Sequence, residues 1–422
     1  MKESLIIIFN LLITFLTQAQ DYQISFVGSG GSTTIDSVQV KNLTQNTGLT
    51  LDGTDVLHLM GIVGIDQAVA HGNAGLCIYP NPMNETSFAE FEATTMGTAT
   101  IELCDITGKQ VAATQIMLPL GKHTFTVSGL SSGIYTLSIQ SVANVYSGKI
   151  VCTGIVRGNP KISYLSGRIK SAAESRLKSA QTLVPMQYND GDQLLFKCFS
   201  GIYSTVIPLV PAQSQTVTVN FVACTDEDNH NYATVTIGTQ IWMAENLNVG
   251  IMIDGVQGQT DNGMVEKYCY YNNVNYCSIY GGLYQWNEMM QYTNIPGYQG
   301  ICPVGWHIPT KEEWITGTDF LGGRDVAGGK MKSTGTIEFG TGLWYSPNTG
   351  ATNESGFTAV PAGELNSVDF TFYSIGYDSR WWCSTYSSDN YAWYWALYDS
   401  YVNIGMFYGP RDNGWSVRCL RD

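Results

Sequence analysis

The sequence predicts a β-rich, multidomain protein in which N-terminal β-sandwich modules precede an α+β domain. With 422 residues, the chain is long enough for about two to four domains, each with its own core. Only 13% of the residues are charged, whereas 45 are Gly and 25 are Tyr. This composition suits short strands and tight turns better than long solvated helices.

The charge balance excludes one class of partner. The formal net charge is -14, and no cluster of Lys and Arg is available to displace counterions from a phosphate backbone. We therefore expect no nucleic-acid partner.

The first twenty residues, MKESLIIIFNLLITFLTQAQ, predict a secretory signal peptide. One Lys precedes a short apolar run, which polar residues and a small Ala follow. No later stretch approaches the roughly 20 apolar residues of a membrane helix, so we expect no transmembrane segment. The predicted location is secreted or at the outer cell surface.

Two β-like segments follow the leader. Residues 21–75 contain YQISFVG, DSVQVKNL and DVLHLMGIVG, separated by Gly, Ser, Thr and Asn, and form the N-terminal β segment. Within 76–151, ATIELCDITGKQVAA predicts a hairpin that turns at Asp105–Lys109, and HTFTVSGLSSGIYTLSIQS repeats the strand-turn-strand pattern.

The second segment resembles a known family. Its motifs IYPNP, DITGK, LSSGIYTLSI and YSGKIV, in this order, resemble the sorting domain that the type IX secretion system of Bacteroidetes-type bacteria recognises. The resemblance implies a β-sandwich over 76–151 and the type IX machinery as a partner. Such domains normally end the polypeptide, whereas this chain continues to residue 422.

Residues 152–223 predict a small β module or a linker. GRIKSAAESRLKSAQ, at 167–181, has the composition of a short helix or a linker. YNDGDQLLFKCFSGIYSTVIPLV then returns to strands around a turn at Asn189–Asp192.

The composition changes towards Trp, Tyr, Gly and Asn over 224–422, which indicates a new domain. Two helices are expected, over 282–292 and 307–323. The second begins with a capping box, because Glu313 stands three residues after Thr310. Short strands and long loops fill the remainder, which is typical of an α+β domain.

This last domain resembles the Fibrobacter succinogenes major paralogous domain, a family of exported modules. The motifs are IGTQIWMAENL, YGGLYQW, CPVGWHIPTKEEW, GFTAVPAGE, WWCSTYSS and WSVRCLRD. The GFTAVPAG stretch and the closing VRC also resemble the C-type-lectin-like fold of formylglycine-generating enzymes and of retroelement variable proteins. A surface-exposed, C-type-lectin-like domain is therefore implied.

The ten cysteines of an exported chain favour disulfides. Spacing does not determine connectivity, although Cys383 and Cys419 are expected to pair with each other or with neighbours. The disulfide candidates are Cys269, Cys277, Cys302, Cys383 and Cys419.

One acidic segment, TDEDNHNY at 225–232, is a weak metal candidate. Asp226, Asp228 and Asn231 offer the hard oxygen ligands that calcium prefers, but the Gly and the distal Glu of an EF-hand are missing. A hairpin turn at Asn229–His230 explains the same residues. Calcium is therefore the one cofactor considered.

Catalysis has little support in the sequence, so we expect no enzyme. GLSSG, at 129–133, matches a nucleophile motif, but it lies between two strand-like runs instead of a strand and a helix. The five His are scattered and form no metal-ligand spacing. An enzyme of the formylglycine-generating type is the catalytic alternative, and it predicts a free reactive thiol among Cys269, Cys302, Cys383 and Cys419.

The segment WWCSTYSSDNYAWYWALYDS, at 381–400, combines Trp and Tyr with Ser, Asp and Asn, the composition of antibody paratopes. Strand alternation assigns Tyr391, Trp393 and Trp395 to the core, and Tyr394 and Tyr398 to the opposite face. The candidate ligand-binding residues are Tyr386, Asp389, Asn390, Tyr394, Tyr398, Tyr401, Asn403 and Tyr408.

The predicted function is an adhesin-like module that recognises a glycan or protein at a cell surface through this aromatic-rich region. The alternative is a structural envelope or matrix protein that has no specific ligand.

Overall fold

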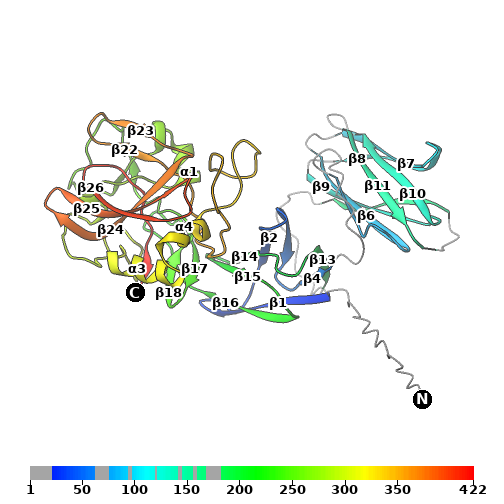
Figure 1. The fold of residues 1–422 in the computed structure, drawn as a ribbon, viewed down its shortest axis with the longest axis horizontal. Coiled ribbons are helices and arrows are strands. Elements are labelled where there is room, and N and C mark those ends of the chain that lie inside the picture. Colours follow the sequence, from blue (N-terminus) through cyan, green and yellow to red (C-terminus); the bar gives the residue numbers. More distant parts are fainter. Residues whose placement is uncertain are drawn as a thin grey trace, which may run out of the picture. The chain divides into compact units, whose positions relative to one another are not determined.

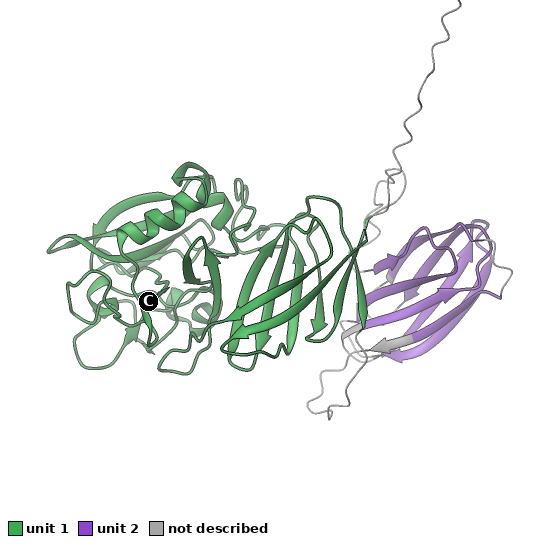
Figure 2. Cartoon of the chain, turned by 90° about the horizontal axis from the view of Figure 1, so that it is seen from below, with its two compact units in different colours: residues 1–63, 180–422 green, residues 64–179 purple. Residues whose placement is uncertain are grey.

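The computed structural model describes residues 21–61, 76–93, 97–118, 121–140, 145–154, 159–167 and 182–422. The predicted signal peptide and the segment 168–181 lie outside the described residues. The chain divides into two compact units, which Figure 2 shows in different colours. Residues 64–179 form the inserted unit, and residues 1–63 together with 180–422 form the larger unit.

The inserted unit has two four-stranded sheets. Their strand orders are β11-β10-β7-β8 and β12-β9-β6-β5. Alternate apolar residues of both sheets, such as Leu103 and Phe125, are buried in one shared core. The strands are β5 Leu76–Tyr79, β6 Thr86–Ala93, β7 Gly97–Asp105, β8 Gln110–Leu118, β9 Gly121–Ser128, β10 Gly133–Gln140, β11 Val145–Cys152 and β12 Lys161–Gly167.

The predicted hairpin at Asp105–Lys109 is confirmed. Strands β7 and β8 pair in antiparallel register, and Gly108 takes φ +82°, a conformation that a residue without Cβ adopts at low cost. The Asp105 carboxylate accepts hydrogen bonds from the backbone of Thr107 and Lys109, which closes the turn.

The next strand-turn-strand segment differs from the predicted hairpin pattern. Strand β9 pairs with β6 and β12, whereas β10 pairs with β7 and β11, so the two strands belong to different sheets. GLSSG forms the connection between them, and Gly129 has φ +72°. The motif therefore has a strand on each side instead of the elbow that leads from a strand into a helix.

A second sandwich lies in the larger unit, and it is built from strands on both sides of the insert. Strand β13 runs parallel to β4, and β1 runs parallel to β16, in the order β13-β4-β1-β16. The opposing sheet pairs β14 with β2. The strands are β1 Asp21–Gly30, β2 Ser37–Asn42, β3 Thr47–Asp52, β4 Val56–Met60, β13 Leu183–Gln187, β14 Leu194–Ser200, β15 Tyr203–Leu209 and β16 Gln215–Phe221.

The sequence patterns predicted that residues 21–75 and 152–223 form separate segments. Strands β1 to β4 and β13 to β16 from these segments instead share both sheets of this sandwich, because pairing between β4 and β13 joins residues that the inserted unit separates along the chain. Strand β12, which also lies in 152–223, pairs with β9 in the inserted unit. The predicted turn at Asn189–Asp192 is confirmed, since the Asp192 amide donates to the Asn189 carbonyl at 2.9 Å.

The sheet of the sandwich continues into the C-terminal module. Strand β15 pairs in parallel with β17, and the eight-stranded order is β21-β27-β18-β17-β15-β14-β2-β3 (Figure 1). A shared sheet makes the sandwich and the module one unit. The new strands are β17 Ala233–Ile237, β18 Gln240–Met243, β21 Trp306–His307 and β27 Leu420–Arg421.

Three small sheets, four α-helices and one 3-10 helix complete the described part of the module. Buried Trp residues dominate two adjacent cores, one around Trp314 and Trp395 and the other around Trp306 and Trp415. The elements are β19 Ile251–Met252, β20 Glu266–Lys267, η1 Tyr270–Asn272, α1 Val274–Tyr280, α2 Trp286–Met289, α3 Lys311–Phe320, α4 Arg324–Met331, β22 Glu364–Asn366, β23 Thr371–Tyr373, β24 Asp378–Ser388, β25 Tyr391–Tyr398 and β26 Gly405–Pro410.

The capping box of α3 is confirmed, with Thr310 and Glu313 in their reciprocal hydrogen bonds. The helix expected over 282–292 has only one turn, α2, because Gln291 and Tyr292 take positive φ and end it. Helices α1 and α4 were not predicted. The sequence of α4, RDVAGGKM, contains two Gly, which lower the helix propensity on which such a prediction depends.

The structure contains the disulfides Cys269–Cys277 and Cys302–Cys419. The expected pairing of Cys383 with Cys419 or a neighbour is wrong, because Cys419 bonds to Cys302 and Cys383 remains a thiol. No helix among the described residues is long and apolar enough to cross a membrane.

Candidate functional site

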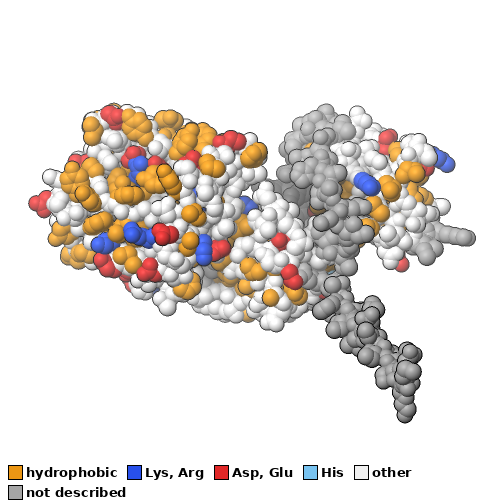
Figure 3. All heavy atoms as spheres, in the orientation of Figure 1, with side chains coloured by type: hydrophobic (Ala, Val, Ile, Leu, Met, Phe, Trp, Pro, Cys, Tyr) orange, Lys and Arg blue, Asp and Glu red, His pale blue; other side chains and the backbone are white. Residues whose placement is uncertain are grey.

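The predicted ligand-binding residues gather on one three-stranded antiparallel sheet and its loops. Strand β25 lies in the middle and pairs with β24 and β26. Hydrophobic side chains gather on the surface of this part of the module (Figure 3). The centre of β25 is covered on both faces, since neither Trp395 nor Ala396 is exposed.

One face of the sheet carries Tyr391, Trp393 and Tyr408, and we call it the Trp393 face. The ring of Tyr408 meets those of Trp393 and Tyr391 edge-on, with centroids 5.6 and 6.1 Å apart. The Lys311 ammonium lies 4.6 Å from the Trp393 ring centroid. Tyr391 is 42% exposed and Tyr408 is 61% exposed. The prediction that Tyr391 belongs to the core is therefore wrong.

The opposite face carries Tyr394, Tyr398 and Phe407, and we call it the Tyr394 face. Tyr394 lies between Trp415, with centroids 4.0 Å apart, and Phe407, with centroids 5.7 Å apart. Both Tyr394 and Tyr398 are half-buried, whereas Phe407 is 42% exposed. Burial raises the pKa of Tyr394 to about 12, so its hydroxyl stays protonated at neutral pH.

A buried ionic cluster supports the Tyr394 face. Arg380 forms ion pairs with Glu364 and with Asp378, the latter at 2.9 Å. The indole N–H of Trp415 donates to Glu364 at 2.8 Å. Burial raises the pKa of Asp378 to about 7, and Arg380 opposes this effect. Glu364 thus holds the Trp415 ring, against which Tyr394 packs.

The remaining candidates lie on loops at the ends of the sheet. Tyr386 is 44% exposed and lies over the Arg411 guanidinium, which also stacks on the buried Trp286 ring at 4.0 Å. Tyr401 is 59% exposed. Exposed Asp389, Asn390 and Asn403 add polar groups. The structure thus brings all eight candidates to one sheet, but divides them between two faces and their rims.

Lys332, which the sequence analysis did not single out, holds the loop that follows β25. Its side chain is fully buried, and its ammonium donates to four backbone carbonyls, of Thr349, Tyr398, Asp399 and Tyr401, at 2.9 to 3.4 Å. Burial lowers the pKa of Lys332 to about 8. In the sequence, Lys332 lies between Met331 and Ser333, and this context carries no local signal of such a role.

We expect Lys332→Met to lower the free energy of unfolding by about 2–3 kcal/mol, because it leaves buried carbonyls without a donor. Lys330→Met is the matched control, since Lys330 forms a partly exposed ion pair with Glu354 at 2.9 Å and such pairs contribute about 0–1 kcal/mol. Urea unfolding measures both variants. Equal losses would contradict the role of the buried ammonium.

The candidate calcium ligands form a turn that lies beside a lysine. Asp226 accepts hydrogen bonds from the amides of Asp228 and His230 and from the Tyr232 hydroxyl. The Lys267 ammonium donates to the Asn248 carbonyl, and burial lowers the pKa of Lys267 against the opposing effect of Asp228 and Asp226. No group of three or more His, Cys, Asp or Glu that could hold a metal occurs within the described ranges.

Asn231, the third candidate ligand, is also engaged in this turn. Its side-chain oxygen accepts from the Thr225 hydroxyl at 2.7 Å, and Asn229 has φ +65° at the tip. The hairpin-turn interpretation of the segment is confirmed.

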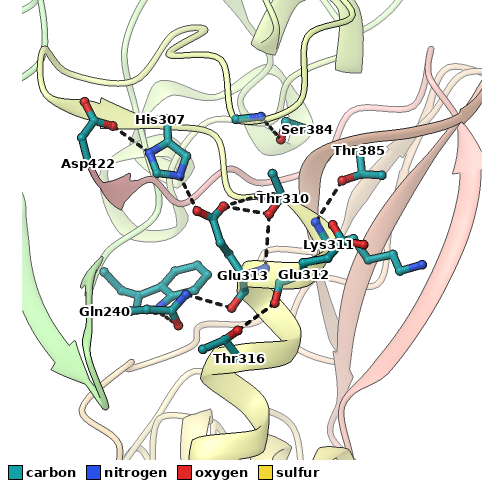
Figure 4. A network of polar contacts seen from close by, with 12 residues as sticks. Gln240, His307, Thr310, Lys311, Glu312, Glu313, Thr316, Ser384, Thr385 and Asp422 are labelled. Carbon is teal, nitrogen blue, oxygen red and sulfur yellow. Dashed lines mark hydrogen bonds and ion pairs between the residues drawn. The ribbon is translucent and has the colours of Figure 1, made fainter.

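His307 lies between two carboxylates at the start of α3 (Figure 4). Its Nδ1 is 2.7 Å from Asp422 and its Nε2 is 3.1 Å from Glu313. Glu313 also accepts from the amide and the hydroxyl of Thr310. Both ring nitrogens of His307 thus have carboxylate partners in the described part of the chain. This arrangement fixes the beginning of α3.

The network shifts two pKa values in opposite directions. The hydrogen bond to Glu313 raises the pKa of His307 against the effect of burial, and Asp422 adds to the rise. Burial acts to raise the pKa of Glu313, but hydrogen bonds from His307 and Thr310 outweigh it and lower the value.

We therefore expect the His307 network to stabilise the fold most between about pH 4.5 and 6.5. The His307 contribution is complete below its unfolded pKa and is lost as pH rises through its raised folded pKa. The Glu313 contribution is complete above its unfolded pKa and is lost as pH falls through its lowered folded pKa. The difference in urea midpoint between the unmodified chain and His307→Gln should be larger at about pH 5.5 than at about pH 8.5. An equal difference at both pH values would sink this interpretation.

Of the four cysteines among which the formylglycine-type alternative predicts a free thiol, Cys383 is the one that forms no disulfide. Its side chain is fully buried, and its sulfur lies 3.2 Å from the Trp393 carbonyl oxygen. Burial raises the pKa of Cys383 to about 12. Reactive cysteines instead have lowered pKa values and solvent access.

Two stretches of the chain match family models. Residues 235–421 match the Fibrobacter succinogenes major domain, and residues 77–153 match the secretion system C-terminal sorting domain. Both expected resemblances are confirmed. No curated protein matches the chain. The sorting domain shows that this is an exported protein, secreted or located at the outer cell surface.

Proposed function

We propose that this exported protein recognises a glycan or a protein at a cell surface through the sheet β24-β25-β26. The observation that carries the proposal is the set of exposed aromatic residues that this sheet and its loops share. These are Tyr386, Tyr391, Tyr401, Phe407 and Tyr408.

The physical argument rests on rigidity. Tyr and Trp side chains offer large contact areas and have only two rotatable angles, so binding freezes little side-chain entropy. Here the rings are fixed further, because Trp393 and Tyr394 pack against their cross-strand neighbours. Exposed apolar patches of this kind mark interaction sites on soluble proteins.

We further propose that the module has a C-type-lectin-like fold and binds without catalysis and without calcium. The buried Cys383 thiol and the carboxylate partners of His307 support binding without catalysis. The hydrogen bonds that already engage Asp226 and Asn231 within the turn support binding without calcium. The type IX machinery is the proposed export partner.

The test is an array of glycans and host-cell proteins probed with residues 21–422, with and without a calcium chelator. The whole chain is needed, because the module shares its central sheet with the sandwich. We expect saturable binding that the chelator leaves unchanged and that Tyr391→Ala with Tyr408→Ala abolishes.

Tyr298→Ala is the matched control, since Tyr298 is 43% exposed and lies outside this sheet. It should bind like the unmodified chain. An absence of saturable binding to every target would overturn the proposal and favour a structural envelope or matrix protein.

A further inference from the structure

Strand β26 is an open edge of the recognition sheet. It lies at one end of the order β24-β25-β26. The other edge, β24, is covered, because Ser379 bridges to Gly363 and Trp381 bridges to Ser416. Open edges present unpaired backbone groups to any strand that can align with them.

The contacts of β24 and β25 determine which groups of β26 face outward. The Trp393 carbonyl accepts from the Cys383 thiol, so it points towards β24. The Trp382 amide donates to the Ser416 carbonyl, so it points away from β25. Trp382 and Tyr394, which lie opposite each other, therefore exchange no backbone hydrogen bonds. Both observations direct the backbone groups of Tyr394 towards β26 and those of Trp393 away from it.

The register then extends this alternation to β26. Phe407 lies opposite Tyr394 and exchanges hydrogen bonds with it, whereas Tyr408 and Met406 lie opposite Trp393 and Trp395. The N–H and C=O groups of Met406 and Tyr408 therefore face outward, and they have no partner in the part of the chain that the structure describes.

We propose that β26 binds an extended peptide segment of the partner as an added strand. The inference rests on the proposed function and specifies its ligand class. Two outward N–H and C=O sets, about 6.7 Å apart, match the two-residue repeat of a peptide backbone. A glycan has no such repeat of paired donors and acceptors.

Side chains on both faces of β26 supply specificity. A docked strand directs alternate side chains towards Tyr408 and Tyr391 on the Trp393 face, and the others towards Phe407 on the Tyr394 face. The strand sequence, GMFYGP, carries no charge and has Pro only at its end. It thus lacks the Lys residues and interior Pro that usually protect an edge.

A partner is a better occupant than a second copy of this chain. Each chain has a net charge of -14, and this charge opposes self-association. The concentration dependence of the mass in solution separates the two occupants.

The test compares Tyr408→Ala with Tyr408→Pro on an array of immobilised peptides, again with residues 21–422. Both variants remove the ring, but only Pro also removes the outward N–H, and an edge strand tolerates Pro where its N–H faces solvent. We expect Tyr408→Pro to bind peptides about tenfold more weakly than Tyr408→Ala, the size of one lost hydrogen bond. Bound peptide should also slow hydrogen exchange at the Met406 and Tyr408 amides of the unmodified chain.

Three outcomes of the peptide-affinity, exchange and mass measurements overturn the inference. These are equal peptide affinities of the two variants when both are folded, unchanged exchange at Met406 and Tyr408 with peptide bound, and a dimer that Tyr408→Pro abolishes. If the Pro variant does not fold, the exchange measurement on the unmodified chain decides. If the chain binds glycans and both variants retain that binding, the peptide ligand is refuted and the proposed function stands. If the unmodified chain binds neither the glycan and protein array nor the peptide array, the inference and the proposed function are both refuted.

Discussion

Replacing Cys302 and Cys419 with Ala is expected to lower the free energy of unfolding by about 5 kcal/mol, because the disulfide closes a loop of 117 residues. The bond restricts the unfolded chain, and the entropy that it removes grows with the logarithm of loop length. Both sulfur atoms also belong to the core that contains Trp306 and Trp415, so reduction loosens the packing around them.

The second disulfide provides the internal comparison. Cys269–Cys277 closes a loop of only 8 residues, and the same relation gives about 2.5 kcal/mol for its removal. Ala is used at all four positions, because Ser would bury an extra hydroxyl. Urea unfolding of both double variants, with and without reductant, measures the two losses. A larger loss from the short loop would show that native packing, and not loop entropy, dominates.

The sequence predicted those features that neighbouring residues determine. Thr310 and Glu313 satisfy each other's backbone donors within one turn of helix, so three residues of spacing were enough to place the start of α3. The turn at Asp105 likewise depends on a local carboxylate and on Gly108. Both features survive in the structure because no distant contact opposes them.

Strand partners were beyond reach, because they depend on residues far apart in the sequence. Val56–Met60 pairs with Leu183–Gln187, although the whole inserted unit separates the two strands in the sequence. Neither strand has a sequence feature that identifies its partner. The sorting domain occupies an internal position in the chain. Residues 64–179 form a compact unit with its own core, and the sandwich is built from the segments on either side of it.

The candidate site shows the same division. Alternation correctly placed Tyr391 and Trp393 on the face opposite Tyr394, because a strand repeats every two residues. Alternation could not show which part of each face is covered by residues from other segments of the chain. Trp415, which follows a separate loop, packs on Tyr394 and leaves it half-buried, whereas nothing in the described residues covers Tyr408 to the same extent.

Arg418→Met is expected to lower the free energy of unfolding by about 3–5 kcal/mol. The guanidinium is fully buried at the centre of the module, where it donates to Asn246, to the Phe357 carbonyl and to the Thr358 carbonyl. It also stacks 3.9 Å from the Phe357 ring centroid. Met replaces the volume of the side chain but offers no donors, so the carbonyls stay buried and unpaired.

Arg421→Met separates this effect from the general loss of an arginine near the end of the chain. Arg421 is exposed and lies 5.9 Å from the Trp306 ring centroid, so its replacement should change stability by less than about 0.5 kcal/mol. Urea unfolding, monitored by Trp fluorescence, reports on the module, because Arg418 lies against the rings of Phe357 and Trp381. If both variants unfold at the same urea concentration, Arg418 does not hold the module together, and the apolar contacts around it are sufficient.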